Sequence, residues 1–171
     1  MTRQKDDWYP TPHTAIKSLL DVEVFDPVIW EPAAGDGAIS KVLELACYEV
    51  ISQDLNDYGY CASGLDFLMA TEREADCLVT NPPYKLAQQF IEHAIGLGVK
   101  KHAWLLRLSF LEGRGRFLEL FDNYPPSRIH VFSKRLTIWR GGEAPAGTGT
   151  TAYAWFVWNS NYNGVPQLGW I

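Results

Sequence analysis

Short apolar segments alternate along this chain with segments of helical periodicity, and most apolar segments stop at a proline, a glycine or an acidic residue. The expected strands cover 27–31, 48–54, 76–80, 102–108, 129–132 and 153–158. The expected helices cover 38–47, 86–97 and 116–121. Repeated strand–helix units predict an α/β fold with a mostly parallel sheet and helices on both faces. No helical pattern separates the last two strands, which predicts an antiparallel strand at one edge.

The length and composition predict one folded domain. The chain has 171 residues, of which 47% are apolar and 20% charged, enough to build a hydrophobic core. We therefore expect residues 1–171 to form a single domain with an arm or helix over 1–27 and no separate target-recognition domain. No apolar run approaches 18 residues and no apolar leader follows the first residues, so no membrane segment and no signal peptide are expected.

The cysteines fit a reducing compartment. There are three of them, at widely spaced positions that match neither a disulfide framework nor a zinc site, namely Cys47, Cys61 and Cys77. A cytoplasmic location and no metal site follow as expectations. The sequence predicts no particular oligomeric state.

The net charge of −5 hides an asymmetry between two parts of the chain. Residues 1–99 carry 6 basic and 16 acidic side chains, whereas residues 100–140 carry 9 basic and 3 acidic ones. A basic segment of this kind suits a phosphate backbone, although it equally fits the solvated face of an ordinary enzyme. The candidate nucleic-acid contacts are Lys85, Arg114, Arg116, Arg128, Lys134 and Arg135.

A glycine-rich turn follows the first expected strand. Its sequence over 31–37 is Glu-Pro-Ala-Ala-Gly-Asp-Gly, and Gly35 and Gly37 would let the backbone approach a ligand closely. The dinucleotide fingerprint needs a third glycine where Ser40 stands, but a nucleoside without a pyrophosphate needs less of that cradle. Asp54 follows the next strand, where a carboxylate accepts hydrogen bonds from ribose hydroxyls. A plain tight turn with a solvated acid is the alternative.

Two further motifs lie farther along the chain. Asp66 and Phe67 pair an acid, which accepts the amino hydrogens of adenine, with a ring that stacks. The second motif, Asn81-Pro82-Pro83-Tyr84, places two prolines directly after a buried strand and so forms a stiff corner. The Asn81 side-chain carbonyl and the Pro82 carbonyl would accept both hydrogens of one planar amino group, and Tyr84 offers a flat surface for the ring. The alternative is a rigid turn.

With these motifs the chain resembles class I S-adenosylmethionine-dependent methyltransferases that modify amino groups, above all the site-specific adenine-N6 DNA methyltransferases, including compact phage-type ones. The resemblance runs from about Trp8 to Trp158. Residues 81–84 match the catalytic motif of that family, and residues 31–37 match its cofactor loop. Residues 8–12 resemble the N-terminal motif that closes over the methionine end of the cofactor.

The resemblance implies a doubly wound, Rossmann-like fold with a mostly parallel seven-stranded sheet and an antiparallel edge strand. It implies S-adenosylmethionine as the cofactor, DNA as the partner with RNA as an alternative, and direct transfer to a flipped or single-stranded adenine. The implied catalytic residues are Asn81, Pro82, Pro83 and Tyr84. The implied cofactor-binding residues are Tyr9, Thr11, Glu31, Ala33, Gly35, Gly37, Asp54, Asp66, Phe67 and Asn81.

Several alternatives stay open at this stage. The same four-residue motif occurs in cytosine-N4, RNA-adenine and protein-glutamine methyltransferases. A non-catalytic nucleic-acid-binding protein with the same fold is a further alternative. Ser109 and Phe110 follow a strand and either line the base pocket or belong to the core.

Overall fold

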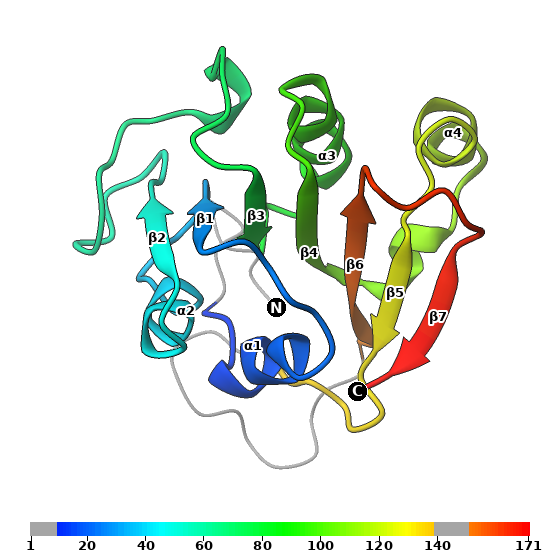
Figure 1. Ribbon diagram of the computed structural model, residues 1–171, viewed down its shortest axis with the longest axis horizontal. Helices are drawn as coiled ribbons and strands as arrows, with labels where there is room; N and C mark the ends of the chain where they lie inside the picture. The colour runs from blue at the N-terminus through cyan, green and yellow to red at the C-terminus, as the bar shows by residue number, and fades with distance from the viewer. Residues whose placement is uncertain (1–9, 139–150) are drawn as a thin grey trace.

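The computed structural model describes residues 10–138 and 151–171, which form one sheet covered by helices on both faces (Figure 1). The helices are α1 (His13–Leu20), α2 (Ser40–Leu45), α3 (Ala87–Gly96) and α4 (Arg114–Arg116), with 3-10 turns η1 (Phe67–Met69) and η2 (Leu108–Leu111) and a π-helical turn η3 (Phe117–Phe121). The strands are β1 (Val28–Glu31), β2 (Glu49–Ser52), β3 (Cys77–Thr80), β4 (Lys101–Arg107), β5 (Arg128–Val131), β6 (Tyr153–Asn159) and β7 (Gln167–Trp170).

The sheet confirms the predicted fold class. Its seven strands follow the order β2-β1-β3-β4-β6-β5-β7. All neighbouring pairs are parallel except those made by β6, which runs antiparallel to β4 and β5. The predicted antiparallel pairing of the last two expected strands is therefore confirmed. Strand β7 is not among the sequence predictions. It pairs in parallel with the outer side of β5 and forms that edge of the sheet, so the antiparallel strand β6 lies inside the sheet between β4 and β5.

The strand order creates a switch point between β1 and β3. From β1 the chain moves to β2 on one side, and it later returns to place β3 on the other side of β1. In open α/β sheets, ligands bind in the crevice outside the carboxyl ends of the strands at such a point. The glycine-rich turn follows β1 and Asn81 follows β3, so the fold brings both predicted motifs to this crevice.

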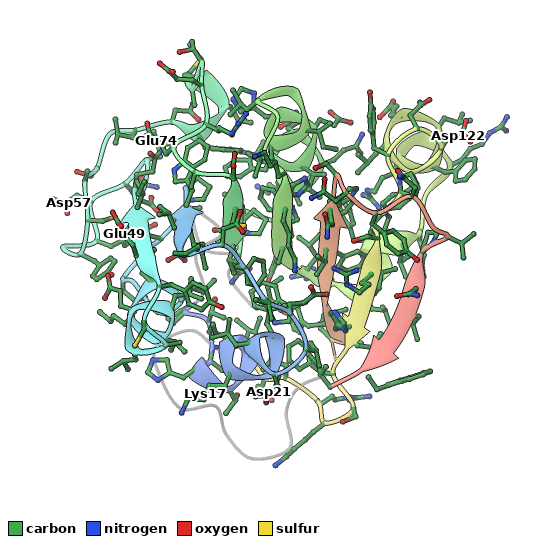
Figure 2. The ribbon with its side chains drawn as sticks, in the orientation of Figure 1. Lys17, Asp21, Glu49, Asp57, Glu74 and Asp122 are labelled. Atoms are coloured by element: carbon green, nitrogen blue, oxygen red, sulfur yellow. The ribbon has the colours of Figure 1, made fainter. Side chains whose placement is uncertain are left out.

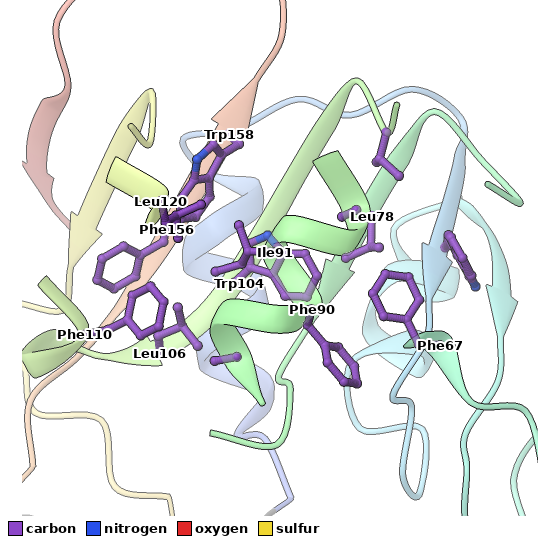
Figure 3. Packing of buried hydrophobic residues seen from close by; sticks show 14 of the residues in the cluster. Phe67, Leu78, Phe90, Ile91, Trp104, Leu106, Phe110, Leu120, Phe156 and Trp158 are labelled. Carbon is purple, nitrogen blue, oxygen red and sulfur yellow. The ribbon is translucent and has the colours of Figure 1, made fainter. Parts of the chain in front are cut away.

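Side chains alternate between two hydrophobic clusters, one on each face of the sheet. On β3, Leu78 packs in the cluster that includes α3, whereas Val79 packs in the cluster that includes α1 and α2. On β4, Trp104 and Leu105 divide in the same way. Figure 3 shows the first cluster, with Phe90 and Ile91 of α3 packed against residues of the sheet. Burial on both faces explains why the central strands are almost continuously apolar.

The described residues also bear on membrane-spanning helices and on the pairing of the cysteines. None of the helices within residues 10–138 and 151–171 has the length and apolar character that crossing a bilayer requires. All three cysteines are free, with Cys77 buried, Cys61 half-buried and Cys47 exposed.

Candidate active site

The turn after β1 is tied directly to the end of β2. Gly35 and Gly37 have φ angles of 56° and 78°, the left-handed region that favours glycine. The Gly35 amide donates to Oδ2 of Asp54 at 2.9 Å. The Asn56 amide donates to Oδ1 of the same carboxylate at 2.8 Å. These two bonds fix the Asp54 carboxylate beside the turn, and each oxygen keeps a further lone pair for a ligand hydroxyl.

A cavity of about 390 Å³ opens at the switch point. Its volume falls in the usual range for small-molecule sites. It brings together nine of the predicted site residues, from five separate parts of the chain: Thr11, Glu31, Ala33, Asp54, Asp66, Phe67, Asn81, Pro83 and Lys85. Gly35 and Gly37 build the turn beside it, and Pro82 is buried. Tyr9 lies outside the described residues.

The cavity has an acidic wall. Glu31, Asp36 and Asp54 all line it, and Glu31 is almost fully buried. Burial raises the pKa of Glu31 well above its usual range, although a hydrogen bond from the Ser40 hydroxyl opposes the rise, and the Asp54 and Asp36 charges add to it. The Asp54 and Asp36 charges that disfavour ionisation of Glu31 would favour a ligand that carries positive charge.

The N-terminal segment reaches the proline-rich corner. Nδ2 of Asn81 donates to the Thr11 hydroxyl oxygen at 3.1 Å, although the two residues are 70 positions apart. Thr11 is buried and lines the cavity. This bond fixes the orientation of the Asn81 side-chain amide. Its nitrogen points toward Thr11, and its carbonyl oxygen points away from Thr11.

A second cavity, of about 180 Å³, lies on the other side of the corner. Tyr84 and Lys85 line it from the corner, and Ser109 and Phe110 line it from the turn after β4, as one reading of the sequence predicts. The remaining lining residues are Ala87, Leu106, Arg107 and Arg116. Lys85 lines both cavities, so both lie beside the segment 81–85.

Phe67 differs from its predicted role. Its ring is 1% exposed and packs edge-on against Trp30 at 5.0 Å and tilted against Phe90 at 4.9 Å between centroids. The ring therefore belongs to the core and only forms part of the cavity wall. Asp66 is exposed, and its Oδ1 accepts a hydrogen bond from the Leu68 amide, which caps η1.

The predicted nucleic-acid contacts fall into different places. Lys85 and Arg116 line the second cavity, although Arg116 also donates to the Phe110 and Glu112 carbonyls. Arg114 is exposed in α4, and Lys134 and Arg135 are exposed after the carboxyl end of β5.

Arg128 does not belong with these residues. It lies at the amino end of β5 and forms a two-bond ion pair with Glu23. The structure therefore corrects its predicted role, because its guanidinium is held at the edge of the sheet opposite to the cavities.

Arg107 lines the second cavity, although the sequence analysis treated it only as one cation of the basic segment 100–140. The sequence indicated it only by its place near the carboxyl end of the expected strand 102–108, and in the structure it is the last residue of β4. No group of side chains in the described ranges could hold a metal ion.

The close approach of Tyr60 to Gly37, in the turn after β1, predicts a difference in stability between two glycine variants. A Cβ on Gly37 would meet the Tyr60 ring at 2.5 Å, whereas a Cβ on Gly59, which has a similar positive φ of 75°, would meet nothing within 4 Å. We expect Gly59→Ala to cost about 1 kcal/mol from the left-handed backbone alone, and Gly37→Ala to cost roughly twice as much. Urea unfolding of both variants measures this. Equal losses would show that Tyr60 does not restrict the turn.

Comparisons with known proteins agree on the fold. A protein of Vibrio vulnificus described as the modification subunit of a type I restriction enzyme matches with a TM-score of 0.61 and 11% identity, over 96% of this chain and 47% of that one. A protein of Pyrococcus horikoshii described as an RNA methyltransferase matches with a TM-score of 0.61 and 17% identity, over 90% and 88% of the two chains. An S-adenosylmethionine-dependent O-methyltransferase of Thermotoga maritima matches with a TM-score of 0.54 and 17% identity, over 89% and 66%.

These similarities are confined to structure. No protein-family model matches the sequence, and no curated protein matches it. From the structural matches, the chain has the Rossmann-like fold of S-adenosylmethionine-dependent methyltransferases. It spans about half the length of the restriction-enzyme subunit.

Proposed function

We propose that this chain is an S-adenosylmethionine-dependent methyltransferase that modifies the exocyclic amine of a nucleobase, with N6 of adenine in DNA as the first candidate. One observation carries the proposal. The corner Asn81–Tyr84 borders two cavities, with Asn81 and Pro83 lining the larger one and Tyr84 lining the smaller one. A methyl donor and a flat acceptor would therefore meet at the residues that the corner makes rigid.

The larger cavity fits S-adenosylmethionine by its chemistry. Its acidic wall of Glu31, Asp36 and Asp54 suits a ligand with a sulfonium and an ammonium group. Asp54 is held by two amides and has lone pairs left for ribose hydroxyls. Leu55 and Leu65 add apolar surface to the lining, which suits a purine ring.

The corner would orient the acceptor amine. The Asn81 carbonyl oxygen and the Pro82 carbonyl would accept its two hydrogens, while the base stacks on Tyr84. When bound, S-adenosylmethionine would supply an electrophilic methyl carbon. The amine would form a bond to that carbon as the carbon–sulfur bond breaks, and the amine would then release one proton to solvent. Holding the amine in line with the methyl group is the main contribution of the chain to the rate.

Methyl transfer tests the proposal directly. The purified chain is incubated with tritiated S-adenosylmethionine and unmethylated genomic DNA or RNA, and the product is digested to nucleosides. We expect N6-methyladenine in DNA. N4-methylcytosine or methylated RNA would transfer the activity to another acceptor of the same chemistry, and no incorporation into either polymer would contradict the proposed function.

The cofactor cavity gives a binding prediction. We expect Asp54→Asn to weaken binding of S-adenosylmethionine about tenfold or more, because a hydrogen bond to a charged group contributes roughly 1.5–3 kcal/mol. Isothermal titration calorimetry measures the affinity. Asp57→Asn is the matched control, since Asp57 lies in the same loop but is exposed and lines neither cavity (Figure 2). Unchanged affinity in the Asp54 variant would place the ribose elsewhere.

A further inference from the structure

Arg107 covers the aromatic ring on which the acceptor base would stack. Its guanidinium carbon lies 5.1 Å from the centroid of the Tyr84 ring. Tyr153, which is 8% exposed, also packs against Tyr84, with centroids 6.1 Å apart. Arg107 itself is exposed at the end of β4 and lines the smaller cavity. Arg107 and Tyr153 are register partners on β4 and β6, so both contact Tyr84 from the same pair of strands, the buried Tyr153 with its ring and the exposed Arg107 with its guanidinium.

We propose that Arg107 occupies the Tyr84 ring until a nucleobase displaces it, and that it then binds the phosphate of the same nucleotide. This inference rests on the proposed function and deepens it, because it names a nucleotide that carries its phosphate, rather than a free nucleoside or another amine, as the preferred acceptor.

The energies favour this exchange. An exposed cation–π contact is a weak interaction. Stacking of a nucleobase on an aromatic side chain is the stronger of the two contacts. A base can therefore displace the guanidinium from Tyr84 with little opposition. The released guanidinium keeps its charge and its forked donors, which match a phosphate.

The surroundings direct the released side chain to the cavity rim. Lys85 and Arg116 line the same cavity, so the rim is positively charged and favours an anion. Arg116 is held by the Phe110 and Glu112 carbonyls. In contrast, within residues 10–138 and 151–171 no carboxylate pairs with Arg107. Arg107 is thus a cation at this rim that is available for a ligand.

The test compares two small probes, deoxyadenosine and deoxyadenosine 5′-monophosphate. Binding is followed by chemical-shift titration of the full chain with excess S-adenosylhomocysteine present, so that the probes do not enter the larger cavity. We expect Arg107→Ala to weaken monophosphate binding about tenfold and to leave deoxyadenosine binding equal or tighter. Arg107→Lys should keep most of the preference for the monophosphate, since it retains the charge.

The control is Lys17→Ala, which removes one positive charge from an exposed position of α1 that lines neither cavity (Figure 2). It should leave both affinities unchanged. Equal weakening of both probes by Arg107→Ala, no change in either, or no binding of either probe to the unmodified chain would overturn the role of Arg107. Methyl transfer by the unmodified chain without a phosphate preference would overturn that role alone, whereas a phosphate preference without methyl transfer would contradict only the proposed function.

Discussion

Replacing Asn81 with alanine is expected to lower turnover at least about 100-fold while cofactor affinity stays close to that of the unmodified chain. The substitution removes the side-chain carbonyl that would hold one hydrogen of the acceptor amine. It leaves the acidic wall of the cofactor cavity intact, including Asp54 with its two amide bonds. Single-turnover methyl transfer and calorimetry with S-adenosylhomocysteine measure the two quantities separately.

Two further variants separate the chemical role of Asn81 from a structural one. Asn81→Asp keeps an acceptor oxygen in a side chain of the same shape, so it should retain much more turnover than the alanine variant. Thr11→Val removes the hydroxyl that accepts from Asn81 Nδ2 and should lower turnover by a smaller factor, on the order of tenfold, by loosening the amide. Full turnover in the alanine variant would remove Asn81 from the mechanism.

The parts of this site that the sequence predicted share one physical origin. A buried strand needs a continuous apolar run, and polar residues directly after such a run must lie at the carboxyl edge of the sheet. That rule placed Glu31 at the carboxyl end of β1, Asp54 after β2 and Asn81 after β3, and the structure brings all three to one cavity. Most of the six predicted strands were recognisable for the same reason, whereas β2, at an edge of the sheet, contains no buried residue.

The parts that the sequence did not predict depend on tertiary contacts. Phe67 follows no strand, and whether an aromatic ring faces a ligand or the core is decided by neighbours such as Trp30 and Phe90. Strand β7 has only four residues, three of them exposed, and it contains a glycine, so it carries no periodic signal. The bond between Thr11 and Asn81 joins residues too far apart in sequence for any local pattern to show.

Arg128 illustrates the limit of charge arguments. As one cation of a basic segment it fitted a phosphate contact, but its actual partner is Glu23, 105 positions away, in the loop between α1 and β1. Glu23 is 4% exposed. It also accepts from Nε2 of His130 at 2.8 Å and pairs with Nζ of Lys101 at 2.7 Å. The number of basic residues in a segment thus predicts a positive surface potential only where no buried acidic residue forms ion pairs with them.

Burial alone would raise the pKa of Glu23, but hydrogen bonds from His130, Arg128 and Lys101 together outweigh it and hold that pKa far below its usual range. A carboxyl group with a lowered folded-state pKa stabilises the fold above its unfolded pKa, about 4.5, and this contribution is lost as the pH falls below that value.

We therefore expect Glu23→Gln to cost about 3 kcal/mol of unfolding free energy at pH 7, because it leaves the partly buried Lys101 and Arg128 without their counter-charge. The difference from the unmodified chain should shrink steadily below about pH 4.5, where Glu23 itself becomes protonated in the unfolded chain. Urea unfolding at several pH values measures both effects. Asp76→Asn is the matched control, since Asp76 also pairs with two cations, Arg73 and Lys100, but on the surface, where solvent screens such pairs. An equal loss in both variants, or a loss for Glu23→Gln that does not depend on pH, would show that charge pairing does not stabilise this end of the sheet.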